Sequence, residues 1–140
     1  MVVVPRDDRL KKLLDKRQFT LVMARPAAAQ SSHFAVHVLR TTPAAFAQPQ
    51  GLWAGVVLPK RWAKRAVTRN GIRRQIYALA AQSLQENQPA LADQGLAIVV
   101  RLRRAFDTQL FVSAWSDVLR RAVRAELEPL ITRAVQARSQ

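Results

Sequence analysis

Residues 95–102, GLAIVVRL, form an apolar run that only Arg101 interrupts. A short run with so few polar residues is typical of a strand whose two faces are both buried. We therefore predict a central strand here, and the rest of the chain can be placed around it.

Helical patterns flank this strand on both sides. The longest spans 62–87, where Ile72, Ile76 and Leu79 recur with the i, i+4, i+7 spacing of an amphipathic helix, before a turn around Pro89. Beyond the strand, Ser113 is expected to cap a last helix, in which Pro129 should produce a kink or an interruption. The apolar positions of that helix are Trp115, Val118, Leu119, Ala122, Val123, Leu127, Leu130 and Ile131.

The N-terminal half adds two strands and a helix. Residues 33–40 alternate between apolar and other side chains, and 51–58 form a second strand that Pro59 ends, with a proline-containing loop over 41–50 between them. Leucines at helical spacing predict a short helix over 8–24, either continuous or broken near Phe19. The order α-β-β-α-β-α, without a repeat or a linker, predicts a single α+β domain over 1–140 with its core at about 8–137.

Composition narrows the function. The 140 residues carry 23 Lys and Arg against 9 Asp and Glu, a formal charge of +14, so the surface should attract polyanions. Cysteine is absent, and the sequence has neither a signal-peptide pattern nor an apolar run long enough for a membrane span, so we expect a soluble cytoplasmic protein with no membrane partner.

Enzyme motifs are missing from the sequence. It contains no phosphate-binding loop, no nucleophile elbow and no metalloprotease motif. His33 and His37 share one face of a predicted strand, but no third ligand lies near them in sequence. We therefore expect neither catalytic residues nor a metal site in the protein itself.

The informative segment is 60–74, KRWAKRAVTRNGIRR, which is strongly basic and contains no acid. On a helix, Arg69 would lie beside Arg73, and Asn70 beside Arg74. Like charges at this spacing repel each other, and the sequence provides no glutamate to relieve the repulsion, so a bound polyanion is the natural counter-charge. A solvated basic face without a partner is the plainer alternative. The predicted RNA-binding residues are Lys60, Arg61, Lys64, Arg65, Arg69, Asn70, Arg73 and Arg74.

This segment resembles the signature of the protein component of bacterial ribonuclease P, which reads as two basic residues, a further lysine, and R-N-R-x-K/R-R on a helix. The resemblance extends upstream to Arg9-Leu10 and Arg17-Gln18-Phe19-x-x-Val22, and downstream to the strand at 96–101, so it spans most of 9–124. The chain departs from the pattern at four positions: Gly71 replaces the second arginine of R-N-R, Arg73 a common lysine, and Met23 and His37 two aromatic residues.

The resemblance implies a fold, a function and partners. The fold would be a ribosomal-protein-like α/β sandwich with a left-handed crossover between parallel strands. The protein would bind the catalytic ribonuclease P RNA and the 5′ leader of precursor tRNA, while the RNA performs the cleavage with Mg²⁺, and the protein alone would hold no cofactor. The leader would lie on the sheet face near the first helix, against Lys16, Arg17, Phe19 and His37. A core role for Phe19 is an equal alternative.

Three other arginines and the tryptophans admit plainer interpretations. Arg120, Arg121 and Arg124 are expected to cover the last helix and add nonspecific attraction, Trp53 and Trp115 to lie in the core, and Trp62 is undecided. The main rival function is a ribosomal or general RNA-binding protein without a role in tRNA processing. A DNA-binding regulator is less favoured because no helix-turn-helix pair is visible, and a membrane-binding helix because the apolar stripe is narrow.

Overall fold

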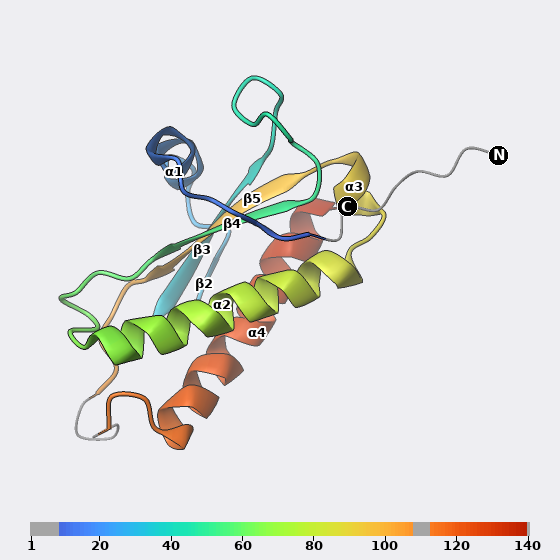
Figure 1. Ribbon diagram of the computed structural model, residues 1–140. Helices are drawn as coiled ribbons and strands as arrows, with labels where there is room; N and C mark the ends of the chain where they lie inside the picture. The colour runs from blue at the N-terminus through green and yellow to red at the C-terminus, as the bar shows by residue number, and fades with distance from the viewer. Residues whose placement is uncertain (1–8, 108–112, 140) are drawn as a thin grey trace.

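The computed structural model describes residues 9–107 and 113–139 and shows one mixed sheet between helices (Figure 1). The sheet order is β1-β4-β5-β3-β2. Helix α1 lies on one face of the sheet, and α2 and α4 lie on the other (Figure 1). The elements of the described residues are β1 (Lys11–Lys12), α1 (Lys16–Met23), β2 (Ala29–Gln30), β3 (Phe34–Arg40), β4 (Leu52–Val57), α2 (Ala66–Glu86), α3 (Ala90–Asp93), β5 (Leu96–Leu102) and α4 (Asp117–Ser139).

Strand β5 is the central strand, as its apolar run predicts. It pairs in parallel with β4 and antiparallel with β3, and Leu96 to Val100 are all buried. Since β4 and β5 are parallel neighbours, the chain between them must cross over, and α2 and α3 form that crossover. The mixed α+β fold is thus confirmed, while the left hand of the crossover stays a prediction.

Side chains alternate between two apolar clusters on the two faces of the sheet. The larger cluster packs alternate residues of β3, β4 and β5 against α2 and α4, and it includes the predicted helical stripe of Ile72, Ile76 and Leu79. The smaller cluster lies under α1, where Val22 meets Ala97 and Val99 of β5. The sheet therefore holds α1 and α2 on opposite sides of β4 and β5.

The predicted helix over 8–24 is wrong in its first half. Residues Lys11 and Lys12 form a strand that pairs with β4, and the helix begins only after Asp15, whose carboxylate accepts a hydrogen bond from the backbone N–H of Arg17 at 2.8 Å. The leucine spacing misled because Leu13 is buried, whereas Leu14 is 80% exposed. From Lys16 to Met23 the helix is continuous, so there is no break at Phe19.

Two further helix boundaries differ from prediction. Helix α2 begins at Ala66 because residues 60–65 form turns after Pro59. Helix α4 begins at Asp117 and is capped by Ser116, whose Oγ accepts a hydrogen bond from the N–H of Leu119 at 3.0 Å; Ser113 is not the cap. Pro129 does not interrupt α4, since it lies on the exposed side, where solvent can reach the carbonyl that loses its N–H partner.

The two histidines do not share a face. His33 precedes β3 and contacts Glu126 of α4, through a backbone N–H to Oε1 hydrogen bond of 2.5 Å and an Nδ1–Oε2 contact of 2.9 Å. Ser31 Oγ also donates to Glu126. Burial alone would raise the pKa of Glu126, but the hydrogen bonds from Ser31 and His33 outweigh it and hold the pKa below its usual value. This carboxylate therefore ties α4 to the turn before β3.

Candidate nucleic-acid interface

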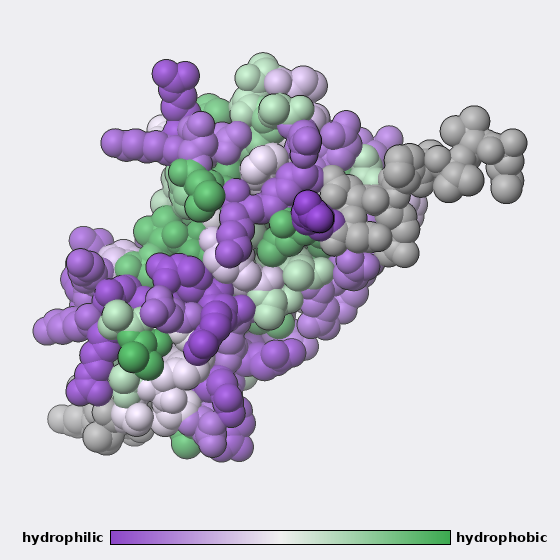
Figure 2. Space-filling view, in the orientation of Figure 1, coloured by the Kyte–Doolittle hydropathy of each residue, from purple (hydrophilic) through white to green (hydrophobic). Residues whose placement is uncertain are grey.

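The basic segment 60–74 divides between the turn after β4 and the first turns of α2. Lys60, Arg61, Lys64 and Arg65 lie in the turn, and the other four predicted residues lie on the helix. All eight side chains are exposed except that of Arg69, which is half-buried. Hydrophilic side chains gather over the outer side of α2 in the space-filling view (Figure 2). The fold thus presents the segment as one surface, which we call the basic surface.

Arg69 braces the basic surface from within. Its Nη1 donates to the carbonyl oxygens of Ala63 at 2.8 Å and Lys64 at 2.9 Å. The guanidinium therefore holds the turn against the helix, and it points back toward the turn rather than along the helix to Arg73. A guanidinium has five N–H donors, so this brace leaves others for a ligand.

Asn70 and Arg73 form a pair within α2. The sequence pattern places Asn70 beside Arg74, but the hydrogen bond joins Asn70 to Arg73, whose Nη1 donates to Asn70 Oδ1 at 2.9 Å. Among the residues that the structure describes, the ion pairs join other groups: His33–Glu126, Arg120–Asp117 and Arg124–Glu128. The cations of the basic surface thus have no carboxylate partner within the described parts of the chain.

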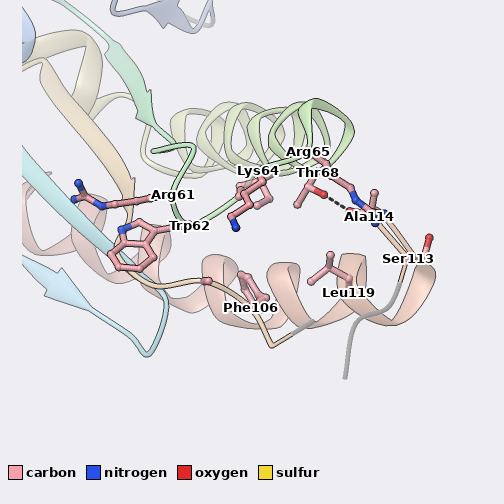
Figure 3. A pocket seen from close by; sticks show the side chains of 12 residues that line it. Arg61, Trp62, Lys64, Arg65, Thr68, Phe106, Ser113, Ala114 and Leu119 are labelled. Carbon is pink, nitrogen blue, oxygen red and sulfur yellow. Dashed lines mark hydrogen bonds between the residues drawn. The ribbon is translucent and has the colours of Figure 1, made fainter. Parts of the chain in front are cut away.

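A pocket of about 330 Å³ lies beside the basic surface (Figure 3). Its apolar lining includes Ile72 and Leu119, and Lys64 points toward it from the turn. At one end, Thr68 Oγ donates to the carbonyl of Ala114, which connects α2 to the segment before α4. The guanidinium carbon of Arg61 lies 5.1 Å from the centre of the Trp62 ring. Trp62, whose role the sequence leaves open, therefore lies at the edge of this surface.

Gly71 is explained by Trp115. A Cβ atom at residue 71 would lie 2.3 Å from Cε2 of the Trp115 indole, which is too close for two non-bonded carbon atoms. The ring therefore packs directly on the backbone of α2, and Trp115 belongs to the edge of the core, as predicted. Sequence reasoning missed this contact because nothing in the local pattern links residues 71 and 115.

The predicted leader residues are only partly brought together. Lys16 and Arg17 are exposed on α1, and Phe19 is half-buried, with its ring directly over Gly55 of β4. His37 is only 7% exposed, and its Nδ1 lies 2.8 Å from the carbonyl oxygen of Arg25. Because the chain after α1 covers this ring, His37 presents no face on which a base could stack, and its predicted stacking role is wrong for this conformation.

No group of three or more His, Asp or Glu side chains lies close enough to hold a metal ion in residues 9–107 and 113–139. Each helix in the same ranges is too short or too polar to traverse a bilayer.

Comparisons with known proteins agree on one family. A family model described as Ribonuclease P matches residues 6–130. The chain is 29% identical over 127 residues to the ribonuclease P protein component of Paraburkholderia xenovorans strain LB400, which covers 89% of this chain and 81% of that protein.

Solved structures of ribonuclease P proteins share the fold. The protein from Thermotoga maritima has a TM-score of 0.58 and 19% identity, covering 88% of this chain and 96% of the other. The Staphylococcus aureus protein has a TM-score of 0.56 and 16% identity, covering 88% and 94%. At these identities, the likeness concerns the fold alone.

Proposed function

The chain belongs to the ribonuclease P protein family, and from this premise we propose that it is the RNA-binding, non-catalytic subunit of that enzyme. Its partners would be a ribonuclease P RNA and precursor tRNA, whose 5′ leader the complex removes, in the cytoplasm. The RNA would perform the cleavage with its bound Mg²⁺, and the protein would supply positive charge and binding surface.

The observation that carries this proposal is the basic surface. Seven of its eight predicted RNA-binding side chains are exposed, and in the described ranges none of its cations is paired with a carboxylate. Arginine side chains suit phosphates because the planar guanidinium can donate two parallel hydrogen bonds. The ribonuclease P RNA would bind here, with Lys60, Arg61, Lys64, Arg65, Arg73 and Arg74 on its backbone and with Arg69 and Asn70 bracing the surface.

The 5′ leader would bind at α1. Lys16 and Arg17 are exposed there, and the part of the Phe19 ring that Gly55 does not cover can stack on a base. Stacking of this kind is sequence-tolerant, because every base has a π-face. His37 takes no part in this site.

A reconstitution assay tests the proposal. The purified chain is mixed with a bacterial ribonuclease P RNA at a Mg²⁺ concentration too low for the RNA alone, and cleavage of precursor tRNA is measured. We expect the chain to restore cleavage at the 5′ end and to cleave nothing by itself. A general RNA-binding protein would bind the RNA without restoring cleavage, and that result would refute the proposal.

The contact residues are tested separately by gel-shift binding. The variant with Lys64→Ala and Arg74→Ala should bind the ribonuclease P RNA at least ten-fold more weakly at moderate salt. The matched control, Arg40→Ala with Arg133→Ala, removes the same charge from the far end of β3 and the C-terminal part of α4. Equal binding by the two variants would move the RNA contact away from the basic surface.

A further inference from the structure

A hollow of about 430 Å³ lies between α2 and α4, next to the basic surface. Gly71 and the ring of Trp115 form its apolar part. Arginines line it from both helices: Arg74 comes from α2, and Arg120 and Arg124 come from α4. We call this the α2–α4 hollow.

Residue 71 has no side chain, which leaves room for the indole at the wall of the hollow. Trp115 packs on the bare backbone there, so a side chain at this position would compete with the indole for the same space. The R-N-R signature that segment 60–74 resembles has an arginine at this position, so this chain lacks one cation on α2. Arg120 and Arg124 place positive charge at the same location from the neighbouring helix.

We infer that the α2–α4 hollow is a second RNA-binding site, which takes the ribose-phosphate backbone of a strand that continues from the basic surface. Arg74 belongs to both surfaces and joins them. This inference rests on the proposed function, because it presumes that RNA is bound at the basic surface.

Arg120 and Arg124 each have a carboxylate partner but keep donors for a phosphate. Arg120 Nη2 lies 2.6 Å from Asp117 Oδ1, and Arg124 Nε lies 3.3 Å from Glu128 Oε2. Both arginine side chains are more than half exposed, at 56% and 52%, and exposed ion pairs of this kind are weak. Each guanidinium also keeps further N–H donors, so a phosphate can add to these pairs or replace the carboxylate.

Gln75 holds the two walls of the hollow together. Its Nε2 donates to the carbonyl oxygen of Arg120 at 3.0 Å, which fixes the start of α4 against α2. Its Oε1 is buried and has no hydrogen-bond partner among the described residues. Because this oxygen is shielded from solvent, the polar contacts to a bound strand would come from the three arginines that line the hollow.

The same helix offers a matched control. Arg121 and Arg133 are exposed on α4 but do not line the hollow, and Arg121 Nε donates to the carbonyl of Asp117 instead. Arg120 and Arg124 would therefore bind RNA at a defined site, whereas Arg121 and Arg133 would only add positive charge.

The test compares two double variants of the full chain. One carries Arg120→Ala and Arg124→Ala, and the other carries Arg121→Ala and Arg133→Ala; each is titrated with ribonuclease P RNA over a range of salt concentrations. We expect the first pair to weaken binding about ten-fold at moderate salt, and to reduce the slope of log affinity against log salt by roughly 1.4 to 1.8, as for two lost phosphate contacts. The control pair should weaken binding by less than about three-fold. Urea unfolding of both variants checks that they are folded.

The outcomes separate this inference from the function on which it rests. If the wild-type chain binds the RNA and the two double variants lose affinity and slope equally, the α2–α4 hollow is not a site, while the proposed function stands. If the wild-type chain does not bind the RNA, the proposed function fails and the inference fails with it. A selective loss in the Arg120→Ala, Arg124→Ala variant alone supports the inference.

Discussion

At the scale of single residues, Gly71 shows how one contact overrides a local preference. Glycine inside a helix is less favourable than alanine by about 1 kcal/mol, so Gly71→Ala would stabilise an isolated α2. In the protein the new Cβ meets the indole of Trp115 at 2.3 Å. We expect a net loss of about 1–3 kcal/mol in the free energy of unfolding, as for other overpacked sites, measured by urea denaturation.

The control for this prediction removes the indole. In a Trp115→Ala background, Gly71→Ala has no ring to meet, so the same substitution should be neutral or stabilising by up to about 1 kcal/mol. A loss of the same size in both backgrounds would show that the contact between residues 71 and 115 is not the cause.

Arg69 differs from its basic neighbours because its guanidinium binds the backbone of the turn before α2. Its two hydrogen bonds to the carbonyls of Ala63 and Lys64 need the guanidinium, and a lysine keeps the charge but not this geometry. We expect Arg69→Lys to lower the free energy of unfolding by about 1–2 kcal/mol. Arg74→Lys, at an exposed position of the same helix, should change it by less than about 0.5 kcal/mol. Equal effects in urea denaturation would mean that Arg69 does not brace the turn.

At the scale of elements, the sequence predicts the strands and helices whose apolar residues repeat with a regular spacing. The apolar run of β5 and the helical stripe of α2 are confirmed, because burial on a sheet or helix imposes a period that can be read locally. The two-residue strand β1 could not be predicted, since it exists only through its pairing with Trp53 and Ala54 of β4.

The predictions of the α4 start and of the His37 exposure are wrong for a related reason. The start of α4 depends on the hydroxyl of Ser116, which is as plausible a cap as Ser113 until the chain is folded. The local alternation of β3 predicts an exposed His37, because it does not reveal that the chain after α1 folds over this ring. In both cases the deciding contact joins parts of the chain that the local pattern does not relate.

The tie between α4 and the turn before β3 predicts a pH dependence. The pKa of Glu126 is held below its ordinary value of 4.5, so its contribution to stability is complete above the pKa of the unfolded chain and is lost as the pH falls through the folded-state pKa. We expect Glu126→Gln to lower the free energy of unfolding by about 1–3 kcal/mol at pH 7. The difference from wild type should shrink between about pH 5 and pH 3. A difference that stays constant over this range in urea denaturation would contradict the assigned role of the carboxylate.

At the scale of the whole molecule, the net charge of +14 predicts a polyanionic partner, and the motif at 60–74 adds the resemblance to ribonuclease P proteins. Seven of the 23 basic residues lie in the acid-free segment 60–74, and the family model that matches residues 6–130 includes this segment. Charge alone does not reveal how that surface continues, because the hollow between α2 and α4 is lined by residues of two separate ranges, 71–78 and 115–124. Sequence predicts which side chains are available, and the fold decides which of them meet.

The same charge predicts opposite effects of salt on the free protein and on its complex. A formal charge of +14 repels itself, and the like charges of the basic surface each oppose folding by a few tenths of a kcal/mol, so raising NaCl from about 0.02 to 0.3 M should increase the free energy of unfolding by about 1 kcal/mol. Binding to ribonuclease P RNA should weaken over the same range, because salt removes the gain from released counterions. Urea denaturation and a binding titration in the same buffers measure the two effects.

Replacing Arg73 and Arg74 by glutamate lowers the net charge by four and should reduce both salt dependences. A free protein that loses stability as salt is added would show that the basic surface is neutralised within the fold, and RNA would then not be needed as its counter-charge.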